Sequence, residues 1–143
     1  MMVVPFPEQQ VEQQVEQLPI AAPEHIVIVR QQVRKRAVEL GFSLVDQTKV
    51  VTAASELARN TMTHGGGGHV RLELITDGAR RGLRLAFEDN GPGIADVALA
   101  MKDGYTTAGG LGLGLSGAKR LSNEFAITSA PGEGTRVVIT RWK

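Results

Sequence analysis

Glycines between residues 109 and 114 are the first residues whose types and spacing could do chemistry. They precede a predicted helix, so backbone N–H groups that no Cβ atom shields, together with the helix dipole, can bind phosphate oxygens. No strand precedes them to complete a dinucleotide site, and no Gly-Lys-Ser or Gly-Lys-Thr follows to complete a P-loop. The sequence therefore indicates an anion-binding loop of another kind. Its residues are Gly109, Gly110, Leu111, Gly112, Leu113 and Gly114.

A carboxylate at the end of a predicted strand is the second candidate. Asp89 is followed by Gly91 and Gly93, which let the backbone approach a flat ligand without a Cβ atom in the way. The same residues are also compatible with a simple turn, because glycine and proline punctuate many loops. The segment 132–135, Gly-Glu-Gly-Thr, is by itself typical of a hairpin turn.

A carboxylate and an amide on one side of a helix are the third candidate. Glu56 and Asn60 are four residues apart, so both side chains project in similar directions from a predicted helix. Thr52, Arg59 and Thr63 extend this polar flank. Such a pair is often only solvated on the surface of a helix, so its interpretation depends on the rest of the chain.

Helices and strands must position these motifs. Apolar spacing predicts helices over residues 23–40, from 43 or 45 to 63, 94–101 and 115–125. Alternating patterns predict strands over residues 69–75, 83–87, 126–130 and 135–142. Residues 11–20 fit either a helix or an edge strand over 15–20, and we favour the strand. This order of elements predicts an α/β two-layer sandwich, a mixed and mostly antiparallel sheet with helices on one face.

Composition narrows the classes of protein. The chain has 143 residues, 42% of them hydrophobic, a net charge of +1, 4% aromatic residues and no cysteine. We expect one domain over residues 15–143, preceded by a flexible Gln- and Pro-rich extension over 1–14. Near-zero charge and few aromatic residues argue against nucleic acid as a partner. No apolar run is long enough to span a membrane, and no signal peptide is evident, so we expect a cytoplasmic protein.

Taken together and in order, the motifs resemble those of the GHKL (Bergerat-fold) ATPase and kinase superfamily. The resemblance covers about residues 23–142, and the four motifs lie at 56–60, 89–93, 109–115 and 132–135. The sequence of residues 103–125 is similar to the corresponding sequences of the RsbT branch of anti-sigma regulatory serine/threonine kinases, which are the stressosome switch kinases. One departure is Asn123, which stands where the branch has an acidic residue.

The resemblance implies ATP and Mg²⁺ as cofactors and assigns roles to the polar candidates. Asn60 matches the magnesium-binding asparagine, and Glu56 matches the catalytic carboxylate that orients the attacking hydroxyl group. Asp89 matches the carboxylate that accepts a hydrogen bond from the adenine amino group, and Thr135 the threonine that assists it.

The resemblance also assigns roles to the glycines. Gly93, with Gly91 before it, would let the adenine base lie against the backbone. The lid over the phosphates would exclude water and so favour transfer over hydrolysis. It would consist of Gly109, Gly110, Leu111, Gly112, Leu113 and Gly114.

The implied function is an ATP-dependent serine/threonine protein kinase of a partner-switching module. Its substrates would be STAS-domain antagonist or scaffold proteins, and the released kinase would activate a phosphatase or another regulator. The alternative is a nucleotide-gated anti-sigma factor that binds a sigma factor. The sequence does not specify an oligomeric state.

Overall fold

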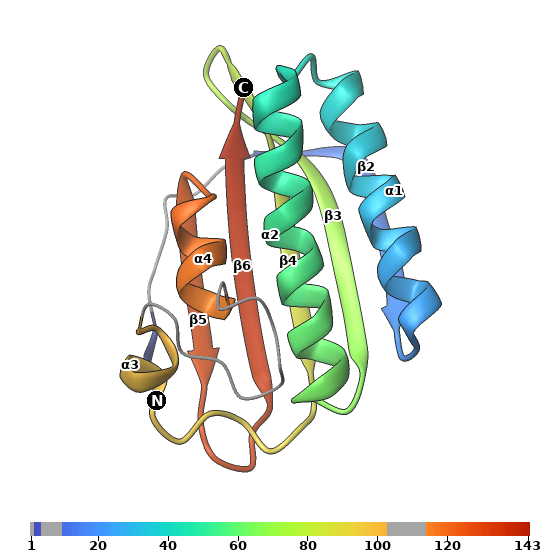
Figure 1. The fold of residues 1–143 in the computed structure, drawn as a ribbon. Helices are drawn as coiled ribbons and strands as arrows, with labels where there is room; N and C mark the ends of the chain where they lie inside the picture. The colour runs from blue at the N-terminus through green and yellow to red at the C-terminus, as the bar shows by residue number, and fades with distance from the viewer. Residues whose placement is uncertain (1, 4–9, 103–113) are drawn as a thin grey trace.

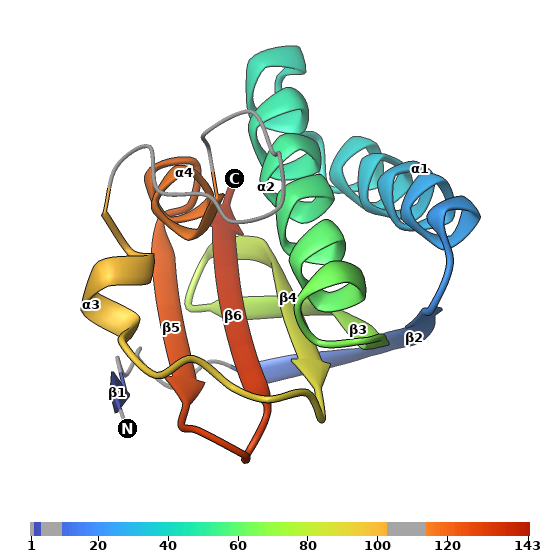
Figure 2. The same ribbon diagram turned by 60° about the horizontal axis from the view of Figure 1, so that its bottom comes forward.

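The computed structural model describes residues 2–3, 10–102 and 114–143, with side chains from residue 15 onward in these ranges. Six strands form one sheet, and helices cover one of its faces (Figures 1 and 2). The strands are β1 (Met2–Val3), β2 (Gln10–Ile20), β3 (Gly68–Asp77), β4 (Arg80–Asp89), β5 (Glu124–Ser129) and β6 (Thr135–Trp142). The helices are α1 (Pro23–Glu39), α2 (Leu44–Thr63), α3 (Val97–Ala100) and α4 (Gly114–Arg120). The expected two-layer α/β sandwich is confirmed.

The order of the strands in the sheet is β1-β5-β6-β4-β3-β2. Every pairing between described strands is antiparallel, in agreement with the mostly antiparallel sheet expected. β4 lies between β3 and β6, and its last residue, Asp89, is opposite Gly68 on one side and Thr135 on the other. Segments far apart in the sequence therefore meet at the end of β4.

The sequence explains where α1 begins. Pro23 at the first helical position has no N–H group to leave unpaired. His25 Nδ1 accepts hydrogen bonds from the N–H groups of Ala21 and Ala22 at 3.0 and 3.2 Å. The helix then buries Val29, Val33 and Ala37 against the sheet.

α2 is the helix that positions the predicted site. Ser43 caps its start, because the Ser43 hydroxyl oxygen accepts a hydrogen bond from the Asp46 N–H group at 3.1 Å. The apolar stripe that includes Val50, Ala54 and Leu57 is buried in the core. The helix ends at Thr63, and His64 caps it before the glycines at 65–68.

The structure differs from the sequence-based prediction in several segments. The helix predicted over 94–101 is shorter than expected, because α3 spans only Val97–Ala100. The strand favoured over residues 15–20 is confirmed, but β2 begins earlier, at Gln10. The helix predicted over 115–125 is wrong at its end, because α4 stops at Arg120 and Phe125 is a buried residue of β5. The turn between them is fixed by Asn123, whose side-chain oxygen accepts a hydrogen bond from the Trp142 N–H group at 2.7 Å. Flexibility of residues 1–14 stays a prediction; residues 1 and 4–9 lie outside the described ranges.

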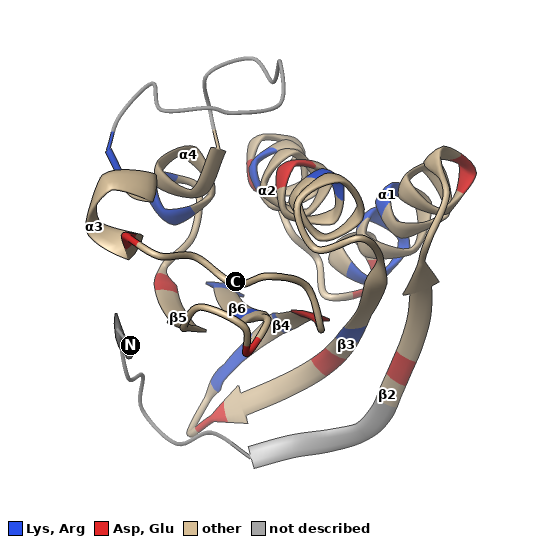
Figure 3. Cartoon of the chain, turned by 90° about the horizontal axis from the view of Figure 1, so that it is seen from below, with Lys and Arg blue, Asp and Glu red and all other residues tan. Residues whose placement is uncertain are grey.

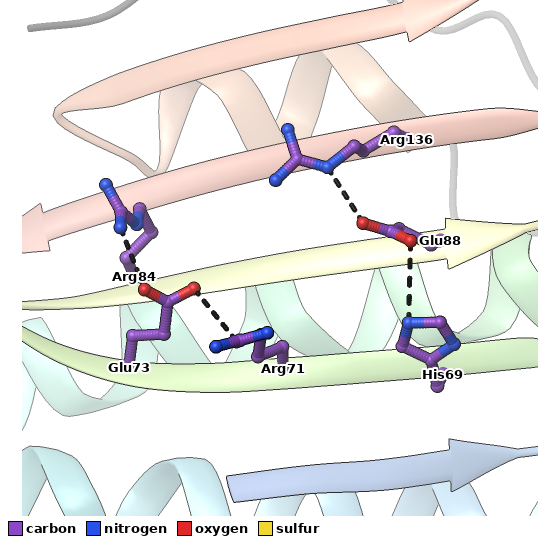
Figure 4. A network of polar contacts seen from close by, with 6 residues as sticks. All are labelled: His69, Arg71, Glu73, Arg84, Glu88 and Arg136. Atoms are coloured by element: carbon purple, nitrogen blue, oxygen red, sulfur yellow. Dashed lines mark hydrogen bonds and ion pairs between the residues drawn. The ribbon is translucent and has the colours of Figure 1, made fainter. Parts of the chain in front are cut away.

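The sheet face opposite the helices carries charges of both signs, as Figure 3 shows on the strands. Arg84 Nη2 lies 2.8 Å from an oxygen of the buried Glu73, and Arg136 Nε lies 2.8 Å from an oxygen of Glu88. Figure 4 shows these two pairs and the longer contacts, at 3.5 Å, that Arg71 and His69 add to them. Opposite charges on neighbouring strands thus compensate one another across this face.

Candidate functional site

A cavity of about 390 Å³ lies where β4, β6 and α2 meet the segment that leads to α3. Its volume is in the range of small-molecule sites. Five residues predicted for the site line it together: Asn60, Asp89, Gly93, Gly114 and Thr135. The fold therefore brings together side chains from three of the four sequence motifs, and the first residue of α4 from the remaining one.

The Asp89 carboxylate is held at the end of β4. Its Oδ1 atom accepts a hydrogen bond from the Gly91 N–H group at 2.9 Å, which fixes the orientation of the carboxylate. Gly91 itself does not line the cavity, so its observed contribution is to Asp89. Among the described residues Oδ2 has no hydrogen-bond partner.

Gly65 is a site residue that sequence reasoning missed. A Cβ atom on Gly65 would lie 2.5 Å from Asp89 Oδ2, so only glycine leaves room for the carboxylate. Gly65 also lines the cavity. The signal in the sequence that points to Gly65 is its position five residues after Asn60, at the start of a run of four glycines.

Gly93 sits where the segment after β4 touches the β5–β6 turn. Its φ angle is +75°, and a Cβ atom there would collide with the carbonyl oxygen of Ala130. The Gly132 N–H group donates to the Pro92 carbonyl oxygen at 2.7 Å and ties the two segments together. Figure 2 shows the chain after β4 passing the ends of β6 and β5 on its way to α3. A glycine at this position thus forms one wall of the cavity.

Thr135 is positioned by Ser129, which the sequence analysis did not identify. Ser129 Oγ accepts from the Ile94 N–H group at 2.8 Å and donates its single proton to the Gly134 carbonyl oxygen at 2.9 Å. Because that proton is used, the Thr135 hydroxyl group must donate in the 2.9 Å contact with Ser129. Its lone pairs then remain available as acceptors beside Asp89.

Asn60 and Glu56 both lie on α2 but differ in their surroundings. The Asn60 side chain lines the cavity and has no hydrogen-bond partner among the described residues. Glu56 is buried, is not among the residues that line the cavity, and pairs with Arg59, whose Nη1 lies 2.6 Å from Oε1. A side-chain amide thus lines the cavity, with a carboxylate one helical turn before it.

The donor set fits a magnesium ion that a nucleotide helps to bind. In the part of the chain that the structure describes, no group of three histidine, cysteine, aspartate or glutamate side chains could hold a metal alone. Mg²⁺ is usually bound through one or two protein oxygens together with phosphates and waters. A single amide oxygen from Asn60 suits this mode.

The glycine-rich segment is described only at its end. Gly109, Gly110, Leu111, Gly112 and Leu113 lie outside the described residues, so the structure does not test their predicted contacts. Gly114 begins α4 and lines the cavity with Leu115.

The fold and cavity are those of a nucleotide-binding domain with a sheet covered on one face. Residues 45–143 match the family described as "Histidine kinase-, DNA gyrase B-, and HSP90-like ATPase", and the chain belongs to this family. The resemblance to the GHKL superfamily is therefore confirmed. Among the described residues, no helix has the length and apolar character needed to cross a membrane.

Individual relatives place the chain more closely. It is 48% identical over 117 residues to "Serine/threonine-protein kinase RsbT" of Bacillus subtilis (strain 168). This match covers 82% of this chain and 88% of the relative. It is 32% identical over 109 residues to "Anti-sigma F factor" of Clostridium kluyveri, which covers 72% of this chain and 75% of that relative. The first similarity confirms the resemblance to the RsbT branch.

One solved structure shares the fold. A crystal structure of the RsbU and RsbW domains of a Mycobacterium tuberculosis protein matches with a TM-score of 0.62 and 24% identity. The match covers 90% of this chain and 31% of that one, so the chain spans about a third of that protein. At this identity the likeness supports the fold alone.

Proposed function

We propose that this protein is an ATP-dependent serine/threonine protein kinase of a bacterial partner-switching module, acting in the cytoplasm on STAS-domain proteins. The observation that carries the proposal is the buried carboxylate of Glu56, one helical turn from an asparagine that lines the cavity. The 48% identity to a protein named as a serine/threonine-protein kinase supports the same reaction.

The residues around the end of β4 are suited to bind adenine. Asp89 Oδ2 would accept a hydrogen bond from the exocyclic amino group, and Thr135 Oγ1 offers lone pairs on the adjacent strand. Gly93 provides backbone without a side chain, so a flat base can lie close to it. Guanine has a carbonyl group where adenine has this amino group, so two acceptors would then face one another.

The residues on α2 are suited to act on the phosphate groups of ATP. The Asn60 amide oxygen would hold Mg²⁺, which when bound neutralises charge on the phosphates. Glu56 would accept a hydrogen bond from the substrate hydroxyl group and orient it towards the γ-phosphate. It would take the hydroxyl proton as the new O–P bond forms and the bond between the γ-phosphorus and the β,γ-bridging oxygen breaks, with ADP as the leaving group. We assign the cover over the phosphates to Gly109, Gly110, Leu111, Gly112, Leu113 and Gly114.

The alternative is a nucleotide-gated anti-sigma factor, favoured by the 32% identity to an anti-sigma F factor. In that case ATP would act as a conformational ligand and the regulated event would be binding. As a kinase, the protein would instead change its complexes by phosphorylation, because a dianionic group at an interface adds repulsion and desolvation cost. Release from such a complex would leave it free to activate a phosphatase or another regulator.

The test is transfer of label from γ-³²P-ATP with Mg²⁺ into host extract and into a recombinant STAS-domain protein of the same host. We expect acid-stable label on a discrete protein with the unchanged chain, and a loss of at least about 100-fold with Glu56→Gln. Glu24→Gln, at the exposed start of α1, is the matched control and should transfer normally.

Two outcomes would contradict the proposal in different ways. Full transfer by Glu56→Gln would show that Glu56 is not the catalytic carboxylate. ATP binding without label, together with capture of a sigma factor from the extract, would favour the anti-sigma factor.

A further inference from the structure

We propose that Arg59 is a positioning residue that holds the Glu56 carboxylate in its productive orientation. The inference rests on the proposed function, because it concerns the carboxylate that orients the attacking hydroxyl group. It assigns a task to Arg59, which lies within the motif at 56–60 but has no role in the proposed function above.

The contact between the two residues is asymmetric. Arg59 Nη1 donates to Glu56 Oε1 at 2.6 Å, and the side chains are 36% and 7% exposed. Among the described residues Glu56 Oε2 has no hydrogen-bond partner. One carboxylate oxygen is therefore fixed, while the lone pairs of the other are not used and would serve to accept a hydrogen bond from a substrate hydroxyl group.

Burial makes this pair different from an ordinary surface ion pair. Exposed pairs three residues apart on a helix contribute little, because water solvates both charges. A carboxylate as buried as Glu56 depends on a partner, since leaving it unpaired costs far more. Among the described residues, Arg59 is the one side chain that pairs with that carboxylate. Without it, the Glu56 side chain would regain rotational freedom or turn towards water.

Orientation is what phosphoryl transfer requires most from the protein. The transition state involves little covalent chemistry by side chains, so rate depends on placing the hydroxyl group in line with the phosphate. A displacement of about 1 Å can cost about 100-fold in rate. Arg59 is not among the residues that line the cavity, so its loss should leave ATP binding intact.

The experiment compares the variants Arg59→Ala and Arg59→Lys with the control Lys49→Ala. It measures transfer of label from γ-³²P-ATP to the protein that the unchanged chain phosphorylates in the test above. We expect Arg59→Ala to lower kcat about 10- to 100-fold, with KM for ATP changed by less than about twofold. Arg59→Lys should restore most of the rate, because an ammonium group can still reach the carboxylate. Lys49→Ala, on the same helix, should retain full activity.

A double variant separates positioning from a general structural effect. Glu56→Gln with Arg59→Ala should be no slower than Glu56→Gln alone, because Arg59 acts through Glu56. Full kcat in Arg59→Ala, a loss that appears in KM for ATP, or an additive loss in the double variant would overturn the inference. If Glu56→Gln is itself fully active, the catalytic assignment of the proposed function fails; if only Arg59→Ala is fully active, the positioning role alone fails.

Discussion

A backbone angle at Gly93 determines the shape of one cavity wall. The residue combines a φ angle of +75° with a position where any Cβ atom would meet the Ala130 carbonyl oxygen. Gly78, in the β3–β4 turn, also has a positive φ angle, +62°, but has open space around it. Gly78 thus shows the effect of a positive φ angle alone, whereas Gly93 combines a positive φ angle with a steric clash.

Replacing each glycine by alanine should therefore destabilise the protein to different degrees. Gly78→Ala should cost about 1–2 kcal/mol of unfolding free energy, the usual penalty of a left-handed conformation for an L-residue. Gly93→Ala should cost clearly more and also weaken ATP binding, because the β5–β6 turn must move. Urea unfolding of both variants measures the difference, and equal losses would contradict the assigned clash.

At the scale of elements, one contact ties the start of α2 to β6. Arg141 Nη2 donates to Asp46 Oδ1 at 2.7 Å. The Arg141 hydrogen bond holds the pKa of the Asp46 carboxyl below its usual value of 3.8. Because α2 carries Asn60 and β6 carries Thr135, this contact helps to hold these two elements, which form two sides of the cavity, in place relative to one another.

The lowered pKa predicts a dependence of stability on pH. A carboxyl group whose pKa is lower in the folded state contributes stability above its unfolded pKa, and loses it as the pH falls through the folded pKa. The wild type should thus exceed Asp46→Asn in unfolding free energy at neutral pH, by no more than about 1 kcal/mol for a partly exposed pair. The difference should shrink below about pH 4. Urea unfolding from pH 7 to pH 3 checks this, and a difference that stays constant would contradict it.

The elements differ in how well the sequence predicts them. Long periodic patterns predicted α1 and α2, and the hairpin of β3 and β4 was evident from alternation around a turn. The end of α4 was not evident, because Phe125 fits a helical apolar stripe as well as a strand. Only its packing in β5 shows that it belongs to a strand. The sequence does not predict the roles of Ser129 and Gly65 for a related reason: their contacts, with Thr135 and Asp89, exist only after the sheet has formed.

At the scale of the whole molecule, the cavity is built from three separate parts of the chain. Asn60 comes from α2, Asp89 from the end of β4 and Thr135 from the start of β6. A ligand that contacts all three binds only the folded arrangement. Its binding free energy therefore adds to the stability of the fold.

Thermal melting should show this linkage. At 100 times its dissociation constant, ATP with Mg²⁺ should add about 2.7 kcal/mol, which corresponds to a rise in Tm of about 5–10 °C. GTP should give no comparable rise. Asp89→Asn should lose the rise, because its amide can present a donor to the adenine amino group, whereas the exposed Asp77→Asn should keep it. A folded Asp89→Asn with an unchanged rise would show that Asp89 does not recognise adenine.

The antiparallel pairing of β4 with β6 also affects the chain during its synthesis. Asp89 and its strand partner Thr135 are 46 positions apart (135 − 89). At about 5–20 residues per second, the ribosome takes about 2–9 s to add the intervening residues. During that interval one edge of β4, with its apolar Leu83, Leu85 and Phe87, has no partner strand. We expect the nascent chain to be most exposed to chaperones and to mispairing then, and to gain nucleotide binding only once β6 has docked.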